Sequence, residues 1–443
     1  MARKGAAWRF SALLIAFGLA AAACSDDESG DTTTTTEANT VTTEGEATTT
    51  GGEGPGSDGT FALGSILPLT GELAEFGPGM QAAVEMAVAD INAAGGVNGS
   101  EVTLTKKDSA NDVETAGPAA ESLVNSDDVD AVIGAASSGV TLAAVIDTVT
   151  GAERLECSGS TTGPQLTEYG DGGYFFRTAP SDLYQAQVLV DLIAAEGYAS
   201  VAIVYRDDTY GDALAAATAD ILLEEVGVEV SEIAMDPNGT DFSNDVEQIV
   251  NEDPGAILLI AYQEEGARLL EEMIKQGIGP ADKPILVTDG LASEELASAV
   301  DPDDPAVLNA MRGTRPASEG EPTEFNERLM AEYGVATTFG PRFYDCVMVL
   351  ALAAEEAGTD DPTKVVEQVI GITKDGEACT SFAECKAAIA EGTDIKYEGV
   401  TSFEFNEFGE PDRGIYQIWH FDTEGLIVPD DTVTVGVDGA SDE

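Results

Sequence analysis

Basic side chains are scarce in this sequence, and their scarcity removes several kinds of function. The 443 residues include one His and 20 Lys or Arg against 82 Asp or Glu, which gives a net charge of −62 at pH 7. Proteins that bind nucleic acid or anionic lipid rely on clustered Lys and Arg, so neither is expected as a partner. We interpret the acidity as surface solvation. Adaptation to a salty environment is the alternative, because salt screens repulsion between surface charges.

Catalytic signatures are also missing. The chain has no G-x-S-x-G, no S-x-x-K and no G-x-x-x-x-G-K-[ST] motif, and its single histidine, His420, lies in an apolar stretch near the C-terminus. Pairs of acidic residues are common, but at this composition they are expected by chance and do not indicate a two-carboxylate glycosidase. We therefore expect a binding protein that is not an enzyme and that uses no cofactor or metal.

The N-terminus has the pattern of an exported protein. Residues 1–23 contain Arg3, Lys4 and Arg9, then an apolar run too short to span a membrane, then the junction Ala21-Ala-Ala-Cys24. This junction resembles a bacterial lipobox, so we expect Cys24 to become the lipidated first residue on the outer face of the cell membrane. Ordinary signal cleavage and release is the alternative. Residues 24–59 are rich in Thr, Glu and Gly and contain no Lys or Arg, which predicts a disordered tether.

From residue 60 onward, strand and helix patterns alternate. Strands are predicted at 61–67, 102–104 and 131–133, with helices over 78–94, 113–125 and 140–150. The alternation starts again at 201–205 and continues to 285–288, so two α/β units with parallel sheets are expected in series. After 312 the pattern is broken. The apolar helix at 343–355 is expected to complete the first unit, and 401–405 and 415–421 are expected to be edge strands.

Two turns rich in hydroxyl groups follow predicted strands. They are Gly134-Ala-Ala-Ser-Ser-Gly139 and Cys157-Ser-Gly-Ser-Thr-Thr-Gly-Pro-Gln-Leu-Thr167. Turns at the carboxyl ends of parallel strands face a common crevice, and hydroxyl groups beside the N–H groups of a helix start can hold an anion. Each turn alone could be an ordinary polar surface turn, but together they predict a small-molecule site.

Cysteine spacing favours disulfides over metal binding. The chain has five Cys, one His and no C-x-x-C motif. Since an exported protein meets oxidising conditions, Cys379 and Cys385 can close a short loop. Cys157 and Cys346 are then the second expected pair.

Several short motifs carry a resemblance to a known family over nearly all of residues 60–430. They are Leu67-Pro-Leu-Thr-Gly71 with Phe76-Gly77, Ala89-Asp-Ile-Asn-Ala-Ala-Gly-Gly96, Ser160-Thr-Thr-Gly-Pro-Gln-Leu-Thr167, Phe176-Arg-Thr178, Tyr210-Gly211 and Phe343-Tyr-Asp345. In order and spacing they resemble the extracellular solute-binding proteins of branched-chain amino-acid ABC transporters, which have the type I periplasmic binding protein fold.

The resemblance implies an α/β fold of two doubly wound parallel-sheet lobes joined by a three-segment hinge. The expected first lobe is 60–181 with 313–398, and the second is 182–312 with 399–430, followed by an acidic tail at 431–443. The lobes would close on a ligand as a Venus flytrap does.

The resemblance also implies a ligand set. Ser138, Ser160 and Thr162 match first-lobe residues that hold the α-carboxylate and ammonium of an amino acid. Tyr210 and Tyr262 match second-lobe aromatic residues that cover the ligand, although a helix cap and a strand-end packing role are their ordinary alternatives.

Two further positions complete this set. Asp289 falls where the family places an acidic partner for the ammonium, usually Glu, and it could instead be a turn residue. Phe76 falls beside the side-chain pocket and could instead belong to the core.

We therefore expect a monomeric substrate-binding lipoprotein that captures a small aliphatic amino acid and delivers it to an ABC permease. Two alternatives remain open. A binder of urea or short amides would use the same hydroxyl turns without needing Asp289 as a countercharge. A ligand-sensing receptor subunit would use the same fold to signal through a partner.

Overall fold

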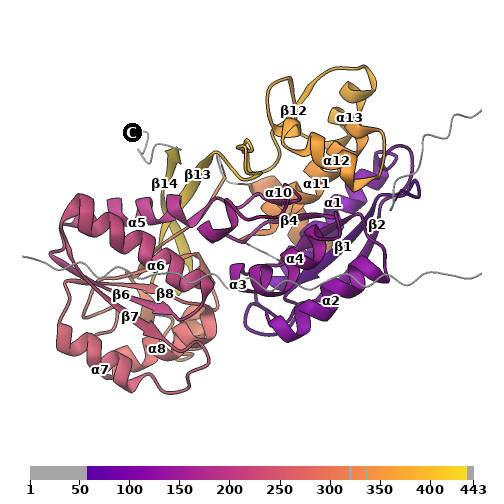
Figure 1. The fold of residues 1–443 in the computed structure, drawn as a ribbon. Coiled ribbons are helices and arrows are strands. Elements are labelled where there is room, and N and C mark those ends of the chain that lie inside the picture. The colour runs from indigo at the N-terminus through magenta and orange to yellow at the C-terminus, as the bar shows by residue number, and fades with distance from the viewer. Residues whose placement is uncertain (1–56, 319–321, 336–337, 437–443) are drawn as a thin grey trace, which may run out of the picture. The chain divides into compact units, whose positions relative to one another are not determined.

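The computed structural model describes residues 57–318, 322–335 and 338–436 (Figure 1). The predicted export signal, the lipidation site at Cys24 and most of the predicted tether lie outside these residues. In the described part of the chain, no helix combines the length and apolar character needed to cross a membrane.

The first sheet within the described residues has five parallel strands in the order β2-β1-β3-β4-β5. Its strands are β1 (Ala62–Leu67), β2 (Thr103–Asp108), β3 (Ala131–Gly134), β4 (Leu155–Ser158) and β5 (Phe175–Arg177). Leu63 pairs with Leu104 on one side and with Ala131 on the other, which makes β1 a central strand.

Helices cover both faces of this sheet. On one face lie α1 (Gly77–Ala93) and α11 (Gly340–Ala357), and on the other lie α2 (Val113–Asn125) and the consecutive short turns α3 (Ser138–Val140), η1 (Thr141–Val145) and α4 (Ile146–Thr150). Adjacent strand residues point to opposite faces. Thus Ile133 packs with the α1 side and Val132 with the α2 side.

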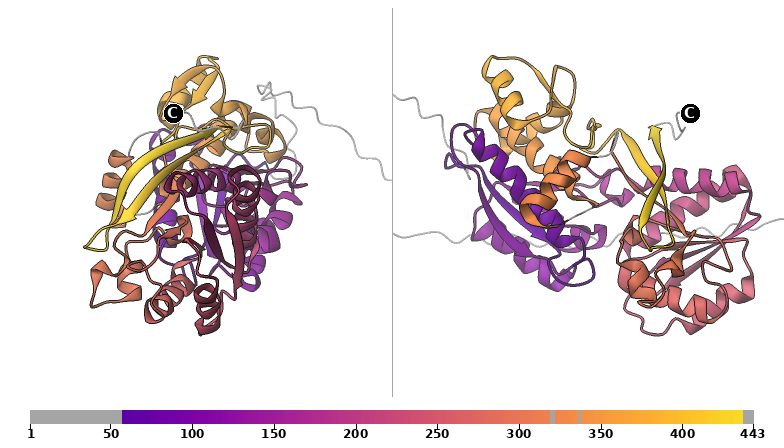
Figure 2. Two further views of the ribbon diagram at one scale, coloured as in Figure 1. Left: turned by 90° about the vertical axis from the view of Figure 1, so that its left-hand side faces the viewer. Right: turned by 180° about the vertical axis from the view of Figure 1, so that it is seen from behind.

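The second sheet has the order β14-β13-β10-β9-β8-β6-β7 among the described residues. Its strands are β6 (Ser200–Arg206), β7 (Glu229–Met235), β8 (Ala256–Ile260), β9 (Ile285–Val287), β10 (Arg312–Pro316), β13 (Arg413–Phe421) and β14 (Ile427–Gly436). Strands β6 to β10 are parallel, whereas β13 and β14 form an antiparallel hairpin on the β10 edge, drawn in yellow in Figure 2.

The helices of the second lobe follow the same two-faced arrangement. Ile203 packs toward α5 (Asp182–Glu196) and α6 (Thr209–Ile221), and its neighbour Val204 packs toward α7 (Ser243–Glu252) and α8 (Gln263–Lys275). The first lobe also contains η2 (Pro164–Leu166), and the second lobe also contains η3 (Leu222–Val226), η4 (Asp289–Leu291), α9 (Leu296–Val300) and η5 (Pro305–Leu308).

A small subdomain packs on α11 in the first lobe (orange in Figure 1). It contains α12 (Pro362–Val369), η6 (Gly371–Thr373), β11 (Glu377–Cys379), α13 (Phe382–Ala390) and β12 (Ile395–Tyr397). The Sγ atoms of Cys379 and Cys385 are 2.09 Å apart here, as the short spacing predicted. Helix α10 (Thr323–Tyr333) packs separately against α1 and α11.

The described chain passes between the lobes after β5, after β10 and before β13. The structure differs from the expected boundaries at the crossings after β10 and before β13, and also at the C-terminal end. Strand β10 lies in the second sheet, so residues 313–316 belong to the second lobe. Strand β14 extends to Gly436, so residues 431–436 are part of a sheet rather than of a tail.

The expected edge strand at 401–405 is wrong, whereas the one at 415–421 is confirmed as part of β13. In residues 401–405, side chains accept the backbone hydrogen bonds that a neighbouring strand would accept in a sheet. The buried Asp345 carboxylate accepts hydrogen bonds from the N–H groups of Val400 and Thr401, and Thr373 Oγ1 accepts one from Phe405 N. Phe405 is fully buried in the first lobe, so residues 399–412 pack there and not on the second sheet.

Candidate ligand-binding site

One cavity, with an empty volume of about 350 Å³ when its open side is included, brings together all seven residues predicted from the sequence. We call it the ligand cavity. The first lobe contributes Phe76, Ser138, Ser160 and Thr162, and the second lobe contributes Tyr210, Tyr262 and Asp289. Each follows the carboxyl end of a strand, where ligands of open α/β sheets bind.

Strand order explains where the first lobe places its part of the cavity. The order 2-1-3-4-5 reverses direction between β1 and β3, and such a reversal opens a crevice between the loops that follow the two strands. Phe76 comes from the loop after β1, and Ser138 comes directly after β3.

The two hydroxyl turns are bonded to each other. Ser160 Oγ donates to the carbonyl of Ala136 at 2.7 Å, and Ser138 Oγ accepts from the N–H of Gly163 at 3.0 Å. Because Ser138 Oγ accepts that bond, its hydroxyl hydrogen can donate to a ligand. The turns therefore form one hydroxyl-lined wall.

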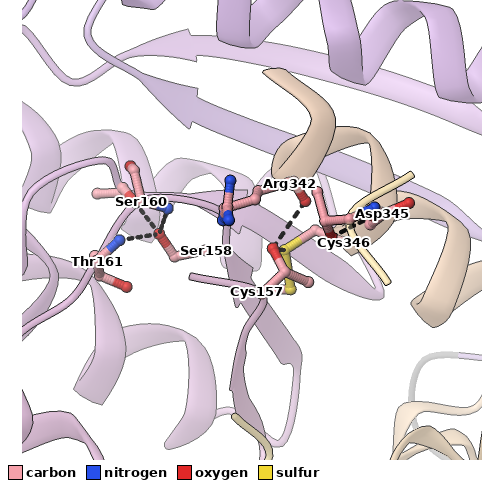
Figure 3. Close-up of a disulfide and its surroundings, with 10 residues drawn as sticks. Cys157, Ser158, Ser160, Thr161, Arg342, Asp345 and Cys346 are labelled. Atoms are coloured by element: carbon pink, nitrogen blue, oxygen red, sulfur yellow. Dashed lines mark hydrogen bonds between the residues drawn. A yellow bond between two sulfur atoms is a disulfide. The ribbon is translucent and has the colours of Figure 1, made fainter. Parts of the chain in front are cut away.

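A disulfide lies directly beneath this wall (Figure 3). The Sγ atoms of Cys157 and Cys346 are 2.06 Å apart and join β4 to α11, the second pairing expected from the sequence. The next residue, Ser158, accepts hydrogen bonds from the N–H groups of Ser160 and Thr161 at 3.4 and 3.2 Å. The start of the second turn is thus held by covalent and hydrogen bonds.

Arg177 holds the same turn from below. Its side chain is 1% exposed, and Nη1 donates to the carbonyls of Thr161 and Gly163 at 3.4 and 2.9 Å. Its Nε donates to Glu410 Oε2 at 2.8 Å, which pairs the two buried charges. Thr162, between the two bonded carbonyls, is therefore fixed in position. We did not predict this role for Arg177.

The opposite side of the cavity is acidic. Asp289 is 4% exposed and accepts a hydrogen bond of 2.9 Å from the hydroxyl of Tyr210. Burial raises the pKa of Asp289, and the bond from Tyr210 opposes that effect.

A second carboxylate stands close behind, and sequence reasoning missed it. Asp182 is fully buried in the first turn of α5, and neither carboxylate oxygen has a hydrogen-bond partner among the described residues. Burial and the nearby charge of Asp289 raise its pKa well above the usual range. The charges of the two buried carboxylates repel each other, and a cation such as an ammonium group would offset this repulsion.

Aromatic side chains of the second lobe form the cover. Tyr210 stacks on Tyr262 with ring centroids 5.6 Å apart, and the guanidinium of Arg206 lies 3.6 Å from the centroid of the Tyr262 ring. Arg206 also forms an ion pair of 3.2 Å with Glu72, which belongs to the first lobe. This pair connects the lobes at the edge of the cover.

The remaining end of the ligand cavity is apolar. Phe76 packs edge to face against Phe339 with ring centroids 5.5 Å apart, and Leu73 and Met80 lie beside them. Only Phe76 was predicted. Met80 lies on the apolar stripe of the predicted helix at 78–94, and that stripe predicted burial without distinguishing core from cavity.

Comparison with known proteins places the chain in a family. A family model described as periplasmic binding protein matches residues 60–386. The chain belongs to the periplasmic binding protein family. Curated relatives include the "Amino acid binding protein" of Pseudomonas aeruginosa, 30% identical over 310 residues that cover 68% of this chain and 79% of the relative.

Two further relatives differ in their described roles. "Leu/Ile/Val-binding protein homolog 1" of Brucella melitensis is 29% identical over 303 residues, 68% of this chain and 80% of its own. "Chemotactic signal transduction system substrate-binding protein BasB" of Halobacterium salinarum is 27% identical over 351 residues, 76% and 81% of the two chains. This periplasmic binding protein is thus a substrate-binding protein of the branched-chain amino-acid transporter type, and not an enzyme.

Solved structures confirm the predicted two-lobed fold. The leucine-binding protein LivK of Thermotoga maritima aligns with a TM-score of 0.72 at 20% identity, over 86% of this chain and 99% of its own. LivJ of Streptococcus pneumoniae, solved with isoleucine, gives 0.70 at 23%, over 85% and 99%. A solute-binding protein of Rhodopseudomonas palustris, solved with p-hydroxybenzoic acid, gives 0.70 at 16%, over 85% and 97%.

Proposed function

We propose that this protein captures a small aliphatic amino acid between its lobes and delivers it to the permease of an ABC importer. The observation that carries the proposal is the division of the ligand cavity. It has a hydroxyl wall on one side, the buried carboxylate of Asp289 on the other, and an apolar end. A zwitterion with an aliphatic side chain matches all three parts.

In the proposed binding mode, the α-carboxylate lies against Ser138, Ser160 and Thr162. The ammonium lies at Asp289, with Asp182 adding negative charge behind it. Hydrogen bonds to charged groups contribute about 1.5–3 kcal/mol each. A few of them, with apolar contacts, account for micromolar affinity, which corresponds to about −8 kcal/mol.

Closure of the lobes completes the site. A ligand docks first on the hydroxyl wall of the first lobe, and rotation of the second lobe brings Tyr210, Tyr262 and Asp289 over it. The ion pair between Arg206 and Glu72 favours the closed arrangement. The closed protein is then the form that the permease recognises, with the monomeric protein held at the membrane through a lipid at Cys24.

Titration calorimetry tests the amino-acid proposal. The unlipidated protein, with Cys24→Ser, is titrated with leucine, isoleucine, valine, acetamide and urea. We expect micromolar binding of an aliphatic amino acid and a loss of at least tenfold in affinity in the double variant Ser138→Ala with Thr162→Ala. Wild-type affinity in the double variant would refute the site. Binding of acetamide or urea alone would assign the site to small amides.

A sensory role is the second candidate function, and the chemotaxis relative from Halobacterium salinarum favours it. The same closed form would then be recognised by a transducer protein. Deletion of the gene distinguishes the two roles. Loss of amino-acid uptake with normal taxis supports transport, and loss of taxis with normal uptake supports sensing.

A further inference from the structure

A second and larger cavity, which we call the hinge-side cavity, shares Phe76 with the ligand cavity. Its empty volume is about 1430 Å³ with its open side included. Residues from both lobes line it, among them Glu75, Ser293, Asn326, Arg342 and Gln417. None of these belongs to the amino-acid site described above.

Arg342 is the unusual group in the hinge-side cavity. It is 4% exposed, and its Nη2 donates to the carbonyl of Ala317 at 2.5 Å. Its Nε has no hydrogen-bond partner in the described part of the chain. Among the residues that the structure describes, no carboxylate forms an ion pair with it, and the charges of Asp345 and Asp289 act on its pKa only from beyond ion-pair distance. Burial lowers its pKa to about 10, which leaves the guanidinium charged at neutral pH.

The other two buried arginines of the described residues each form an ion pair with a buried carboxylate. Arg177 pairs with Glu410, and Arg206 pairs with Glu265, both of them buried carboxylates. A buried charge without a countercharge is strongly unfavourable. Arg342 therefore has the chemistry of a site for an external anion, and its planar guanidinium fits a carboxylate through two parallel hydrogen bonds.

Unpaired acceptors line the same cavity. Glu75 Oε1 and Asn326 Oδ1 are both buried and lack hydrogen-bond partners within residues 57–318, 322–335 and 338–436. Burial and the neighbouring Glu295 raise the pKa of Glu75 to about 7. Buried polar atoms are normally hydrogen-bonded, so these acceptors match a ligand that also carries a hydrogen-bond donor.

We propose that the hinge-side cavity binds a small carboxylate bearing a hydroxyl or amine group, with the carboxylate on Arg342 and the donor group toward Glu75 and Asn326. This ligand is separate from the amino acid of the ligand cavity. Because residues of both lobes line the hinge-side cavity, its ligand is enclosed when the lobes close.

Ligand-detected NMR with the full-length Cys24→Ser protein tests this site. The probes are L-lactate and L-malate, which carry a carboxylate and a hydroxyl, acetate, which lacks the hydroxyl, and ethylene glycol, which lacks the carboxylate. We expect lactate and malate to bind more tightly than acetate, and ethylene glycol to show no saturable binding.

Variants assign the binding to this cavity. Arg342→Lys keeps the charge but loses the guanidinium fork, and we expect at least tenfold weaker lactate binding. Asn326→Leu removes an acceptor and should weaken lactate more than acetate. Arg268→Gln, a partly exposed arginine of the second lobe, is the matched control and should change nothing. Because Arg342 is buried, a thermal melt checks that the Arg342→Lys protein is folded. If it is not folded, the lactate affinity of Asn326→Leu tests the proposal.

Undetectable binding of lactate and malate would overturn the proposal. Unchanged lactate affinity in Arg342→Lys and Asn326→Leu would do the same, as would lactate binding that is lost in the Ser138→Ala, Thr162→Ala variant. Leucine is titrated separately on the same samples. Loss of leucine binding alone counts against the amino-acid proposal, and loss of lactate binding alone counts against this one.

Discussion

Replacing Asp289 with Asn isolates the charge that we assign to ammonium recognition. The amide has nearly the same shape, and its oxygen can still accept the 2.9 Å hydrogen bond from Tyr210. The change therefore removes a negative charge from a site that is 4% exposed while keeping the packing.

Two opposite effects follow from that one change. An ammonium would lose a charge-assisted hydrogen bond worth roughly 1.5–3 kcal/mol, which corresponds to about a 10- to 150-fold loss of affinity. The ligand-free protein should become more stable at neutral pH. Burial raises the pKa of Asp289 in the folded state, so this carboxyl group ionises at lower pH in the unfolded chain than in the folded protein. The free energy of unfolding therefore falls as the pH rises from the unfolded-state pKa of Asp289 to its folded-state pKa. Asn removes this loss, and it also removes a charge that faces Asp182.

Calorimetric titration with leucine and thermal melts from pH 4 to pH 8 measure both effects. We expect weaker binding together with a higher melting temperature at pH 7, and the gain in melting temperature should shrink toward pH 4. Glu264→Gln, which removes an exposed carboxylate of the same lobe, is the control. Unchanged leucine affinity in Asp289→Asn would refute the assigned contact. A lower melting temperature at pH 7 would refute the account of the buried charge.

Other features of the structure give further predictions. Glu156 is fully buried, neither of its carboxylate oxygens has a hydrogen-bond partner among the residues described, and burial raises its pKa well above the usual range. Glu156→Gln should therefore raise the melting temperature by an amount that grows from pH 4 to pH 8, and a pH-independent difference would contradict this. Glu72→Gln removes the ion pair with Arg206 at a partly exposed site. Ligand dissociation in stopped flow should become about 1.5- to 5-fold faster, with the difference vanishing at 1 M salt. Replacing Cys157 and Cys346 together by Ser opens a loop of sequence separation 189 and should cost about 2–4 kcal/mol of unfolding free energy in denaturant titrations. The same change at the short-loop disulfide should cost less, and equal losses would contradict the loop-length argument.

Local sequence pattern was enough to predict much of the fold. The helix expected at 113–125 is α2 (Val113–Asn125), and the one expected at 78–94 differs from α1 by one residue at each end. These helices carry regular apolar stripes and clear end signals. The two hydroxyl turns were located from the strands that they follow, whereas the full set of seven ligand residues came from the family resemblance. The seven lie in one cavity because the carboxyl ends of parallel strands meet at a common edge of each sheet.

The features that sequence reasoning missed depend on contacts between distant segments. Residues 401–405 have the apolar alternation of a strand. Backbone N–H groups of this segment, however, donate hydrogen bonds to the side chains of Asp345 and Thr373 and not to a neighbouring strand. Asp182 looks like an ordinary acidic residue in a first helical turn, and only the packing of α5 behind the cavity makes it an unpaired buried carboxylate. Phe339 lies more than 250 residues after Phe76, its partner in the apolar wall.

The bonds of Arg177 bear on how this protein could acquire new ligands. Arg177 joins the hydroxyl turn to Glu410, which lies in the segment that crosses back to the second lobe. Substitutions in that turn would therefore disturb the crossing as well as the binding surface. The side chains of Leu73, Phe76 and Met80 in the apolar wall are hydrocarbon or thioether groups, which contact the ligand cavity by packing alone among the described residues. Changes of specificity, in evolution or in a designed sensor, should therefore accumulate at this wall while the hydroxyl turns stay fixed.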